Sequence, residues 1–502
     1  MATTKTSQQN KKKTKSSNVF LISVIFALVI SAIILLLDLL PFIQKTELKT
    51  LDLRFRLRPT LYTSPNIGYI DYDDKSIDLF GFWPWPRNRQ VALVDTLKFY
   101  NSRAAGYDVF FSENSNIVFY PELLTSILER PVEYYKKFII ETKPELQKNI
   151  SDYSVIDRTI YKNLLLHTLE NSFKDYDSDF EQSLYNAKNI YLAKFMSFPS
   201  EDLAILPIEE LLKKVRANRE NFPEDKKLAL AEIEKSALPD TAVSKEVIKS
   251  LFKTFDLVMP LYRFTRASAG VGFAQIVEDL DYTVRLFPLL LHYDNHLFPA
   301  IALKMVADIL DFKLTDIEIQ PGKYIKLKNA LVYGSENNER KDIVLPVDKN
   351  CQILMNWAGH FNNTYFHFSF KTIAYYYAHI KSKELCKSAP ADLEYLDIIY
   401  SDIRNFLIHE QLVEAQDIDK ISAKIALAHC IEPCILKNEN PEQIKSKIKI
   451  ESVLNVFDEV YGSVKFSVDM LSKLEKNSEL NFSELYNAAN NQNLSEEQAR
   501  EI

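Results

Sequence analysis

The first strong pattern along the chain is an apolar run near the N-terminus. Val19 to Leu37 reads VFLISVIFALVISAIILLL, nineteen residues without a charge. Because roughly 20 apolar residues span a bilayer as a helix, the run predicts a transmembrane helix at residues 19–40. A cleavable signal peptide has a shorter apolar core and a small-residue cleavage site, and no A-x-A follows this run. The pattern therefore favours an uncleaved anchor in the cytoplasmic membrane.

Basic residues on either side of this run predict its orientation. Cytoplasmic flanks carry an excess of Lys and Arg, and residues 1–18 contain five lysines. We expect this basic tail in the cytoplasm and residues 41–502 in the periplasm or another extracytoplasmic space, so that the chain crosses the membrane once. A second apolar stretch, Leu286 to Leu310, is interrupted by charged and histidine residues and is rejected as a span.

Residues 41–375 alternate between strand and helix patterns. Residues 65–71 and 104–111 are short apolar strand patterns, and residues 89–100 between them have apolar positions at helical spacing. This order predicts a parallel pair of strands with a right-handed crossover, and hence a mostly parallel α/β domain. Further strands are predicted at residues 189–195, 271–276, 284–290 and 352–356, and a helix with a proline near its first turn at residues 298–310.

Two segments depart from this alternation. Residues 114–172 and 201–254 are rich in Lys, Glu, Leu and Tyr at helical spacing, and both are predicted to be helical insertions in the α/β domain. From about residue 371 the pattern is entirely helical and highly charged. We therefore divide the chain into a tail (1–18), an anchor (19–40), an α/β domain (41–375) and an all-helical extension (376–502).

Composition excludes several classes of function. The chain of 502 residues has 61 Lys+Arg against 68 Asp+Glu, a net charge of −7 that argues against a nucleic-acid partner. Only nine glycines are present and none forms a phosphate-binding loop, so no nucleotide cofactor is expected. The four cysteines indicate ordinary thiols or one disulfide. The eight histidines lack the spacing of a metal site, so no metal is expected.

An acidic segment, Asp71-Tyr72-Asp73-Asp74, follows the first predicted strand. Open α/β sheets bind ligands at the carboxyl ends of their strands. Three interpretations remain open: capping of the next helix with pairing to Arg87 or Arg89, a small-ligand or cation site, and hydrolysis with Asp71 as nucleophile and Asp73 as acid or base. The third lacks a matching downstream lysine and acidic pair.

Three further features are candidates for a ligand site. Trp83 and Trp85 lie on a segment that two prolines hold extended, so the indoles either stack on a ligand or cover the edge of the sheet, with Arg87 paired to a nearby acid. Asp108 lies in an apolar strand pattern, where a buried charge needs a partner, and Arg87 or Arg285 could supply it. Arg285 also follows Asp279-Leu280-Asp281, a pattern typical of a turn with a salt bridge.

Eight short segments occur in a definite order after the anchor. In that order the chain resembles the CHASE-two domain, the second of the cyclase/histidine-kinase-associated extracytoplasmic sensor domains. Tyr282 and Cys351 replace glycines usual in that family, and its closing strand is not visible before residue 502. The segments are ELKTLDLRFRLRP (47–59), IDYDDKS (70–76), WPWPR (83–87), GYDVFFSE (106–113), DF with NIYLA (179–193), GVGF (270–273), DLDYTVR (279–285) and LPVD through ILMNW (345–357).

The resemblance implies a non-catalytic sensor whose output is a nucleotide cyclase or a kinase in the cytoplasm. It implies that this chain is the N-terminal part of a longer receptor, and by analogy with receptors a homodimer. The stimulus is an unidentified small ligand or protein. The alternatives are a membrane-anchored interaction scaffold and, with less support, the aspartate-dependent hydrolase. A ligand pocket is predicted at the carboxyl ends of the strands, lined by Asp71, Asp73, Trp83, Trp85, Arg87, Asp108 and Arg285.

Overall fold

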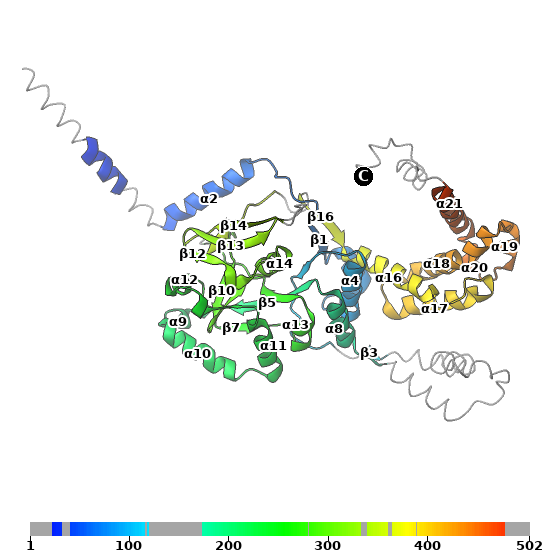
Figure 1. The fold of residues 1–502 in the computed structure, drawn as a ribbon, viewed down its shortest axis with the longest axis horizontal. Coiled ribbons are helices and arrows are strands. Elements are labelled where there is room, and N and C mark those ends of the chain that lie inside the picture. The colour runs from blue at the N-terminus through cyan, green and yellow to red at the C-terminus, as the bar shows by residue number, and fades with distance from the viewer. Residues whose placement is uncertain are drawn as a thin grey trace, which may run out of the picture.

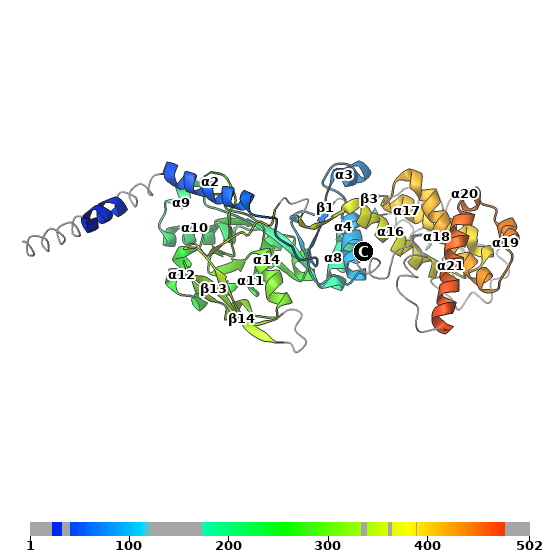
Figure 2. The ribbon, with the colours of Figure 1, turned by 90° about the horizontal axis from the view of Figure 1, so that it is seen from above.

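The computed structural model describes residues 23–32, 41–115, 118–119, 173–279, 281–332, 339–359, 364–387 and 389–476. Figures 1 and 2 show an α/β body with the helix α2 (Pro41–Leu57) toward one end of the long axis. A group of helices, α16 to α21, lies at the other end. The body and this helical extension therefore lie side by side, and α2 runs along the surface of the body.

Only part of the predicted anchor is described. Residues 23–32 are helical with exposed side chains, whereas residues 19–22 and 33–40 lie outside the described residues. Within the described part of the chain, no helix combines the length and the apolar character that crossing a bilayer requires.

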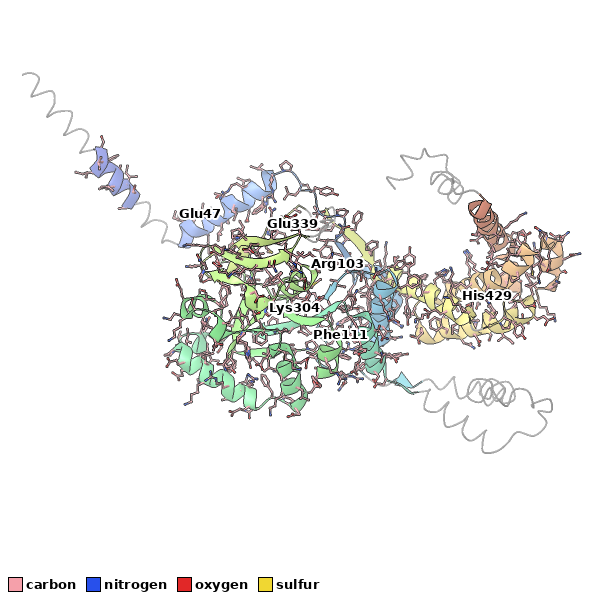
Figure 3. All side chains as sticks on the ribbon, viewed as in Figure 1. Glu47, Arg103, Phe111, Lys304, Glu339 and His429 are labelled. Carbon is pink, nitrogen blue, oxygen red and sulfur yellow. The ribbon has the colours of Figure 1, made fainter. Side chains whose placement is uncertain are left out.

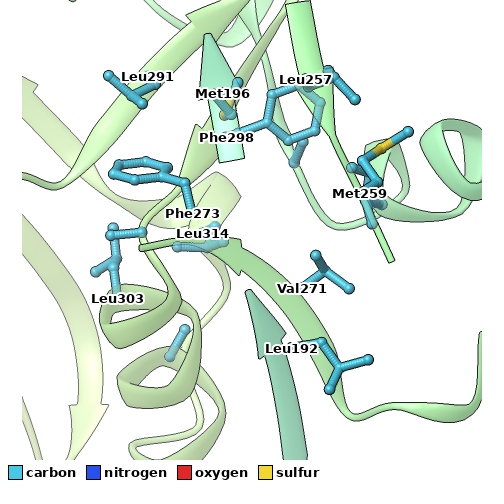
Figure 4. Packing of buried hydrophobic residues seen from close by; sticks show 14 of the residues in the cluster. Leu192, Met196, Leu257, Met259, Val271, Phe273, Leu291, Phe298, Leu303 and Leu314 are labelled. Atoms are coloured by element: carbon cyan, nitrogen blue, oxygen red, sulfur yellow. The ribbon is translucent and has the colours of Figure 1, made fainter. Parts of the chain in front are cut away.

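A four-stranded sheet forms the centre of the body. Strand β5 (Ile190–Ser197) pairs in parallel with β2 (Ala105–Tyr107) and β8 (Gly270–Phe273), and its last residues pair antiparallel with β7 (Asp256–Val258). β5 is almost wholly buried, as is typical of a parallel strand covered on both faces. The apolar side chains around it form the main core, part of which Figure 4 shows. The strands predicted at 189–195 and 271–276 are thus confirmed.

The first predicted strand does not join this sheet. Strand β1 (Gly68–Asp71) pairs in parallel with β16 (Phe366–Ser369), which follows it by almost 300 residues, and β2 pairs with β5 instead. The prediction that residues 65–71 and 104–111 form one parallel pair is therefore wrong. The pairing with β16 brings Phe370 under Tyr72, with ring centroids 5.0 Å apart. Helices α3 (Asp74–Phe80) and α4 (Arg87–Phe99) connect β1 to β2.

Smaller antiparallel sheets complete the body. The rejected second span, residues 286–310, folds as three strands and a helix. That helix begins at Ile301, and Pro299 ends the preceding strand, so the predicted start at residue 298 is wrong. The elements are β9 (Leu286–Pro288) with β15 (Gln352–Leu354), β10 (Leu290–Tyr293) with β11 (His296–Pro299) and β6 (Leu238–Pro239), β12 (Glu318–Gln320) with β13 (Tyr324–Leu331) and β14 (Arg340–Pro346), and the helix α14 (Ile301–Ile309).

The insertion predicted at residues 201–254 is mainly helical, as expected. Of the other insertion, residues 116–117 and 120–172 lie outside the described residues, and β3 (Val118–Phe119) pairs with β4 (Phe173–Lys174) at its base. The remaining helices of the body are α8 (Tyr176–Ala187), α9 (Glu201–Ala204), α10 (Ile208–Glu220), α11 (Glu224–Glu234), α12 (Lys245–Ser250) and α13 (Tyr262–Ala267), with short 3₁₀ turns at Asp240–Ala242 and Leu314–Asp316.

The C-terminal region is helical through the last described residue, Lys476. Its helices enclose a second core, to which Ala92 of α4 and Phe80 of α3 also contribute. The extension is thus packed onto the body rather than tethered to it. Its elements are α16 (Phe370–Lys387), α17 (Leu396–Glu410), α18 (Ala415–Leu436), α19 (Pro441–Lys447), α20 (Glu451–Leu454) and α21 (Phe457–Lys476), with a 3₁₀ turn at Leu393–Tyr395.

Candidate functional site

The tryptophan segment folds back onto β1 and the start of α16. Trp85 is buried, and its Nε1–H donates a hydrogen bond of 2.7 Å to the carbonyl oxygen of Gly81. The Tyr72 ring is stacked on Trp85 at 5.2 Å between centroids and meets Trp83 edge-on at 5.3 Å. The indoles therefore cover the β1–β16 pair, which agrees with the second of the two interpretations of this segment.

The acidic segment is engaged in local contacts. Asp73 caps α3 by accepting hydrogen bonds from the backbone N–H of Ser76 (3.1 Å) and from the hydroxyls of Ser76 (2.5 Å) and Ser369 (2.8 Å). Burial opposes ionisation, but these hydrogen bonds outweigh it and lower the pKa of Asp73. Asp71 pairs with Nδ1 of His367 at 2.8 Å. Helix capping is thus confirmed, and among the described residues no ion pair joins this segment to Arg87, which binds Asp177 instead.

Arg87 instead joins α4 to α8. Its Nε lies 3.3 Å from Oδ1 of Asp177, its Nη2 donates to the carbonyl oxygen of Glu113 at 2.9 Å, and its guanidinium lies 4.8 Å from the centre of the Phe111 ring. Asp177 also accepts hydrogen bonds from the backbone and hydroxyl of Ser115. The nearby acid expected for Arg87 is therefore Asp177, which the sequence analysis did not identify.

Asp108 is exposed, contrary to the prediction. Strand β2 ends at Tyr107, so Asp108 lies just beyond it and faces solvent. Among the described residues it forms an ion pair with neither Arg87 nor Arg285. A carboxylate in water needs no compensating charge, so the argument from burial fails at this position.

Arg285 is the centre of a buried ion-pair network. Its side chain is 2% exposed and contacts three carboxylates. Two bonds, Nε to Oδ1 at 2.7 Å and Nη2 to Oδ2 at 2.6 Å, form a bidentate pair with Asp52 of α2. In the same network, Nη1 of Arg285 donates to Oδ2 of Asp279 at 2.9 Å and to Oδ1 of Asp281 at 2.8 Å, and Nη2 donates to Oδ2 of Asp281 at 2.9 Å. Hydrogen bonds from Arg285 lower the pKa of both Asp52 and Asp281.

A second set of contacts holds the end of α2. Arg58 donates from Nη1 to Oδ1 of Asn356 at 2.6 Å and also donates to the carbonyl oxygen of Trp357. The backbone N–H of Leu61 donates to the carbonyl oxygen of Ala358 at 2.8 Å. The helix that follows the predicted anchor is therefore fastened to the body through polar contacts at Asp52 and Arg58.

The seven residues predicted to line one pocket fall into separate places. Trp83 and Trp85 lie together, next to Asp71 and Asp73 at the β1–β16 pair. Arg87 lies on the α8 side of α4, Asp108 is exposed, and Arg285 binds α2. A ligand-binding role for these residues stays a prediction. Asp52 is the residue that the sequence analysis missed, because its partner lies 233 positions away.

The fold and these contacts define an α/β domain whose N-terminal helix is joined to its core by a buried ion-pair network. The family model described as the CHASE2 domain matches residues 25–397, about three quarters of the chain, and the chain belongs to this family. The resemblance found in the sequence is thus confirmed. CHASE2 domains are extracytoplasmic sensor domains rather than catalytic domains. No curated protein and no solved structure matches the chain significantly.

Proposed function

We propose that this chain is a membrane-anchored extracytoplasmic sensor that passes a stimulus to a cytoplasmic nucleotide cyclase or kinase. Residues 19–40 anchor it, residues 1–18 lie in the cytoplasm, and the α/β body and helical extension lie outside. A homodimer is part of this proposal, because transmission by a single helix requires that it move against a partner.

The observation that carries the proposal is the attachment of α2 to the core through Arg285. A stimulus acts on an output only if it binds two states of the protein differently, and the output must be mechanically connected to those states. Asp52 lies about a dozen residues after residue 40, the end of the predicted anchor. Its pair with Arg285 is bidentate, and the Arg285 side chain is buried. A rearrangement of residues 279–285 would therefore move the membrane-proximal helix.

Reporter fusions in bacterial membranes test the location. The full chain is fused at its C-terminus either to alkaline phosphatase, which is active only outside the cytoplasm, or to green fluorescent protein, which fluoresces when it folds inside. We expect an active phosphatase fusion and a dark fluorescent fusion, and the reverse for the same reporters fused after residue 18. A fluorescent full-length fusion with inactive phosphatase would contradict the proposed location.

A further inference from the structure

A cavity of about 600 Å³ lies where the body meets the helical extension. One wall is α3, and the other is formed by α17 and the N-terminal half of α18. Its volume is within the range of pockets that bind small molecules. Because α3 belongs to the matched CHASE2 region and α18 lies beyond it, a ligand here would contact both. The lining residues are Asp78, Leu79, Arg404, Ile408, Gln411, Val413, Glu414, Ala415, Ile418 and Asp419.

The α3 wall supplies a carboxylate, that of Asp78. Asp78 is exposed on this wall, and its side chain forms neither an ion pair nor a hydrogen bond with any other residue that the structure describes. By contrast, Glu414 across the cavity is paired with Lys371. Asp78 is therefore available to bind an ammonium group of a ligand.

The opposite wall supplies donors. Arg404 uses its Nε to bind Asp419 at 2.6 Å, and its guanidinium carries further N–H donors. Ala415, also in the lining, is the first residue of the 22-residue helix α18, whose N-cap residue Glu414 makes no side-chain capping bond. The first N–H groups of a helix attract anions. This wall can therefore accept a carboxylate.

The charges of the lining select against simple ions. Glu414 is paired with Lys371 and Asp419 with Arg404, so the unpaired carboxylate of Asp78 leaves the lining with a net negative charge, which repels a ligand that is only an anion. A ligand that is only a cation leaves the donors of the α17–α18 wall unused. Between the two walls lie the aliphatic side chains of Leu79, Ile408, Val413 and Ile418. The lining thus combines an ammonium acceptor, carboxylate donors and apolar surface.

We propose that this cavity binds a free α-amino acid with an apolar side chain. The ammonium group binds Asp78, the carboxylate binds Arg404 and the N-terminus of α18, and the side chain packs on the aliphatic residues. The inference deepens the proposed function, on which it rests only in assigning the ligand the role of stimulus. Binding itself can be measured whatever the orientation of the chain in the membrane.

Isothermal titration calorimetry on the detergent-solubilised full chain tests the proposal. Each of the twenty L-amino acids is titrated. The amino acid that binds most tightly is then compared with its N-acetylated form, which lacks the ammonium group, and with the amine that lacks its carboxylate. We expect saturable binding of at least one apolar amino acid and a loss of ten-fold or more in affinity for both derivatives. No binding by any amino acid, or equal binding of the amine, would overturn it.

A matched pair of substitutions locates the site. Asp78→Asn should lower the affinity for the amino acid by ten-fold or more. Asp74→Asn, on the same helix but outside the lining, should leave that affinity unchanged. Unchanged melting temperatures show that both variants fold. Equal affinities of the two variants would place the ligand elsewhere. If binding follows this pattern but the reporter fusions place the chain in the cytoplasm, the site stands and the sensor proposal fails.

Discussion

Replacing Lys194 with methionine should stabilise the protein. Lys194 lies in the middle of β5, and its side chain is 0% exposed. Its Nζ lies 3.5 Å from the centre of the Phe298 ring and, within the described residues, has no hydrogen-bond partner. Glu234, the acid whose charge favours the protonated amine, is already paired with Arg219 at 2.9 Å. An amine in this position is not compensated as a cation.

The size of the effect follows from the charge state of this amine. Burial lowers the pKa of Lys194 well below its ordinary value. The Phe298 ring favours the cation by on the order of 2 kcal/mol, which does not offset the several kcal/mol that desolvation costs. Holding the amine uncharged costs about 1.4 kcal/mol for each pH unit below the ordinary lysine pKa, so the cost at pH 7 is at most about 4 to 5 kcal/mol. Methionine has similar length and escapes this cost.

The pH dependence gives the prediction its sign. Between the lowered pKa of Lys194 and the ordinary one, the unfolded chain binds one more proton than the folded chain, so the stability of the parent protein rises with pH. The advantage of Lys194→Met should therefore be larger at pH 7 than at pH 9.5, by up to about 3 to 4 kcal/mol.

Chemical unfolding of the full chain, followed by circular dichroism at pH 7 and 9.5, measures this difference. Lys245→Met, at an exposed position at the start of α12, is the matched control and should change stability by less than about 0.5 kcal/mol. Loss of stability in Lys194→Met at pH 7, or a gain that is the same at both pH values, would refute the reasoning.

Two further substitutions test the packing. Arg285→Gln should lower the free energy of unfolding by about 3 to 5 kcal/mol because three carboxylates lose their cation, whereas Asp108→Asn, at an exposed position, should be neutral; equal effects in chemical unfolding would contradict the network. Gly272→Ala should cost about 3 kcal/mol or more, because a Cβ there would lie 2.3 Å from the Cα of Ile301. Gly462→Ala, with open space around it in α21, should be neutral or stabilising in the same assay.

Short-range patterns in the sequence predicted most of the body. The apolar runs at β5 and β8 and the helical spacing at α4 are local signals, because burial of each element depends on its own side chains. The helical character of residues 201–254 and of the extension was visible for the same reason. The helix start at Ile301 was missed because Phe298 and Pro299 belong to β11, where they pair with Leu291 and Leu290 of β10.

Pairings between distant segments were not predictable. Parallel β1 and β2 were expected to be neighbours because they are consecutive, but β16 takes that place, and nothing near residue 70 indicates residues 366–369. The prediction of a single pocket was wrong for a related reason, because residues at strand ends were assumed to meet at one edge of one sheet. Asp52 lies in the charged sequence LDLRFRLR, and no local feature there indicates that its partner is the distant Arg285 rather than one of the neighbouring arginines.

The central claim is that Arg285 connects the α/β body through Asp52 to α2, the helix that follows the predicted anchor. Hydrogen–deuterium exchange on the full chain tests it by comparing Asp52→Asn with Glu47→Gln, a change at an exposed residue of the same helix (Figure 3). Most of the stability of a helix in a protein comes from its tertiary contacts, so loss of the pair should loosen α2.

We expect the amides of residues 41–57 to exchange at least ten-fold faster in Asp52→Asn and at the parent rate in Glu47→Gln, with β5 protected equally in both. Unchanged exchange of residues 41–57 in Asp52→Asn, or an equal increase across β5, would contradict the account.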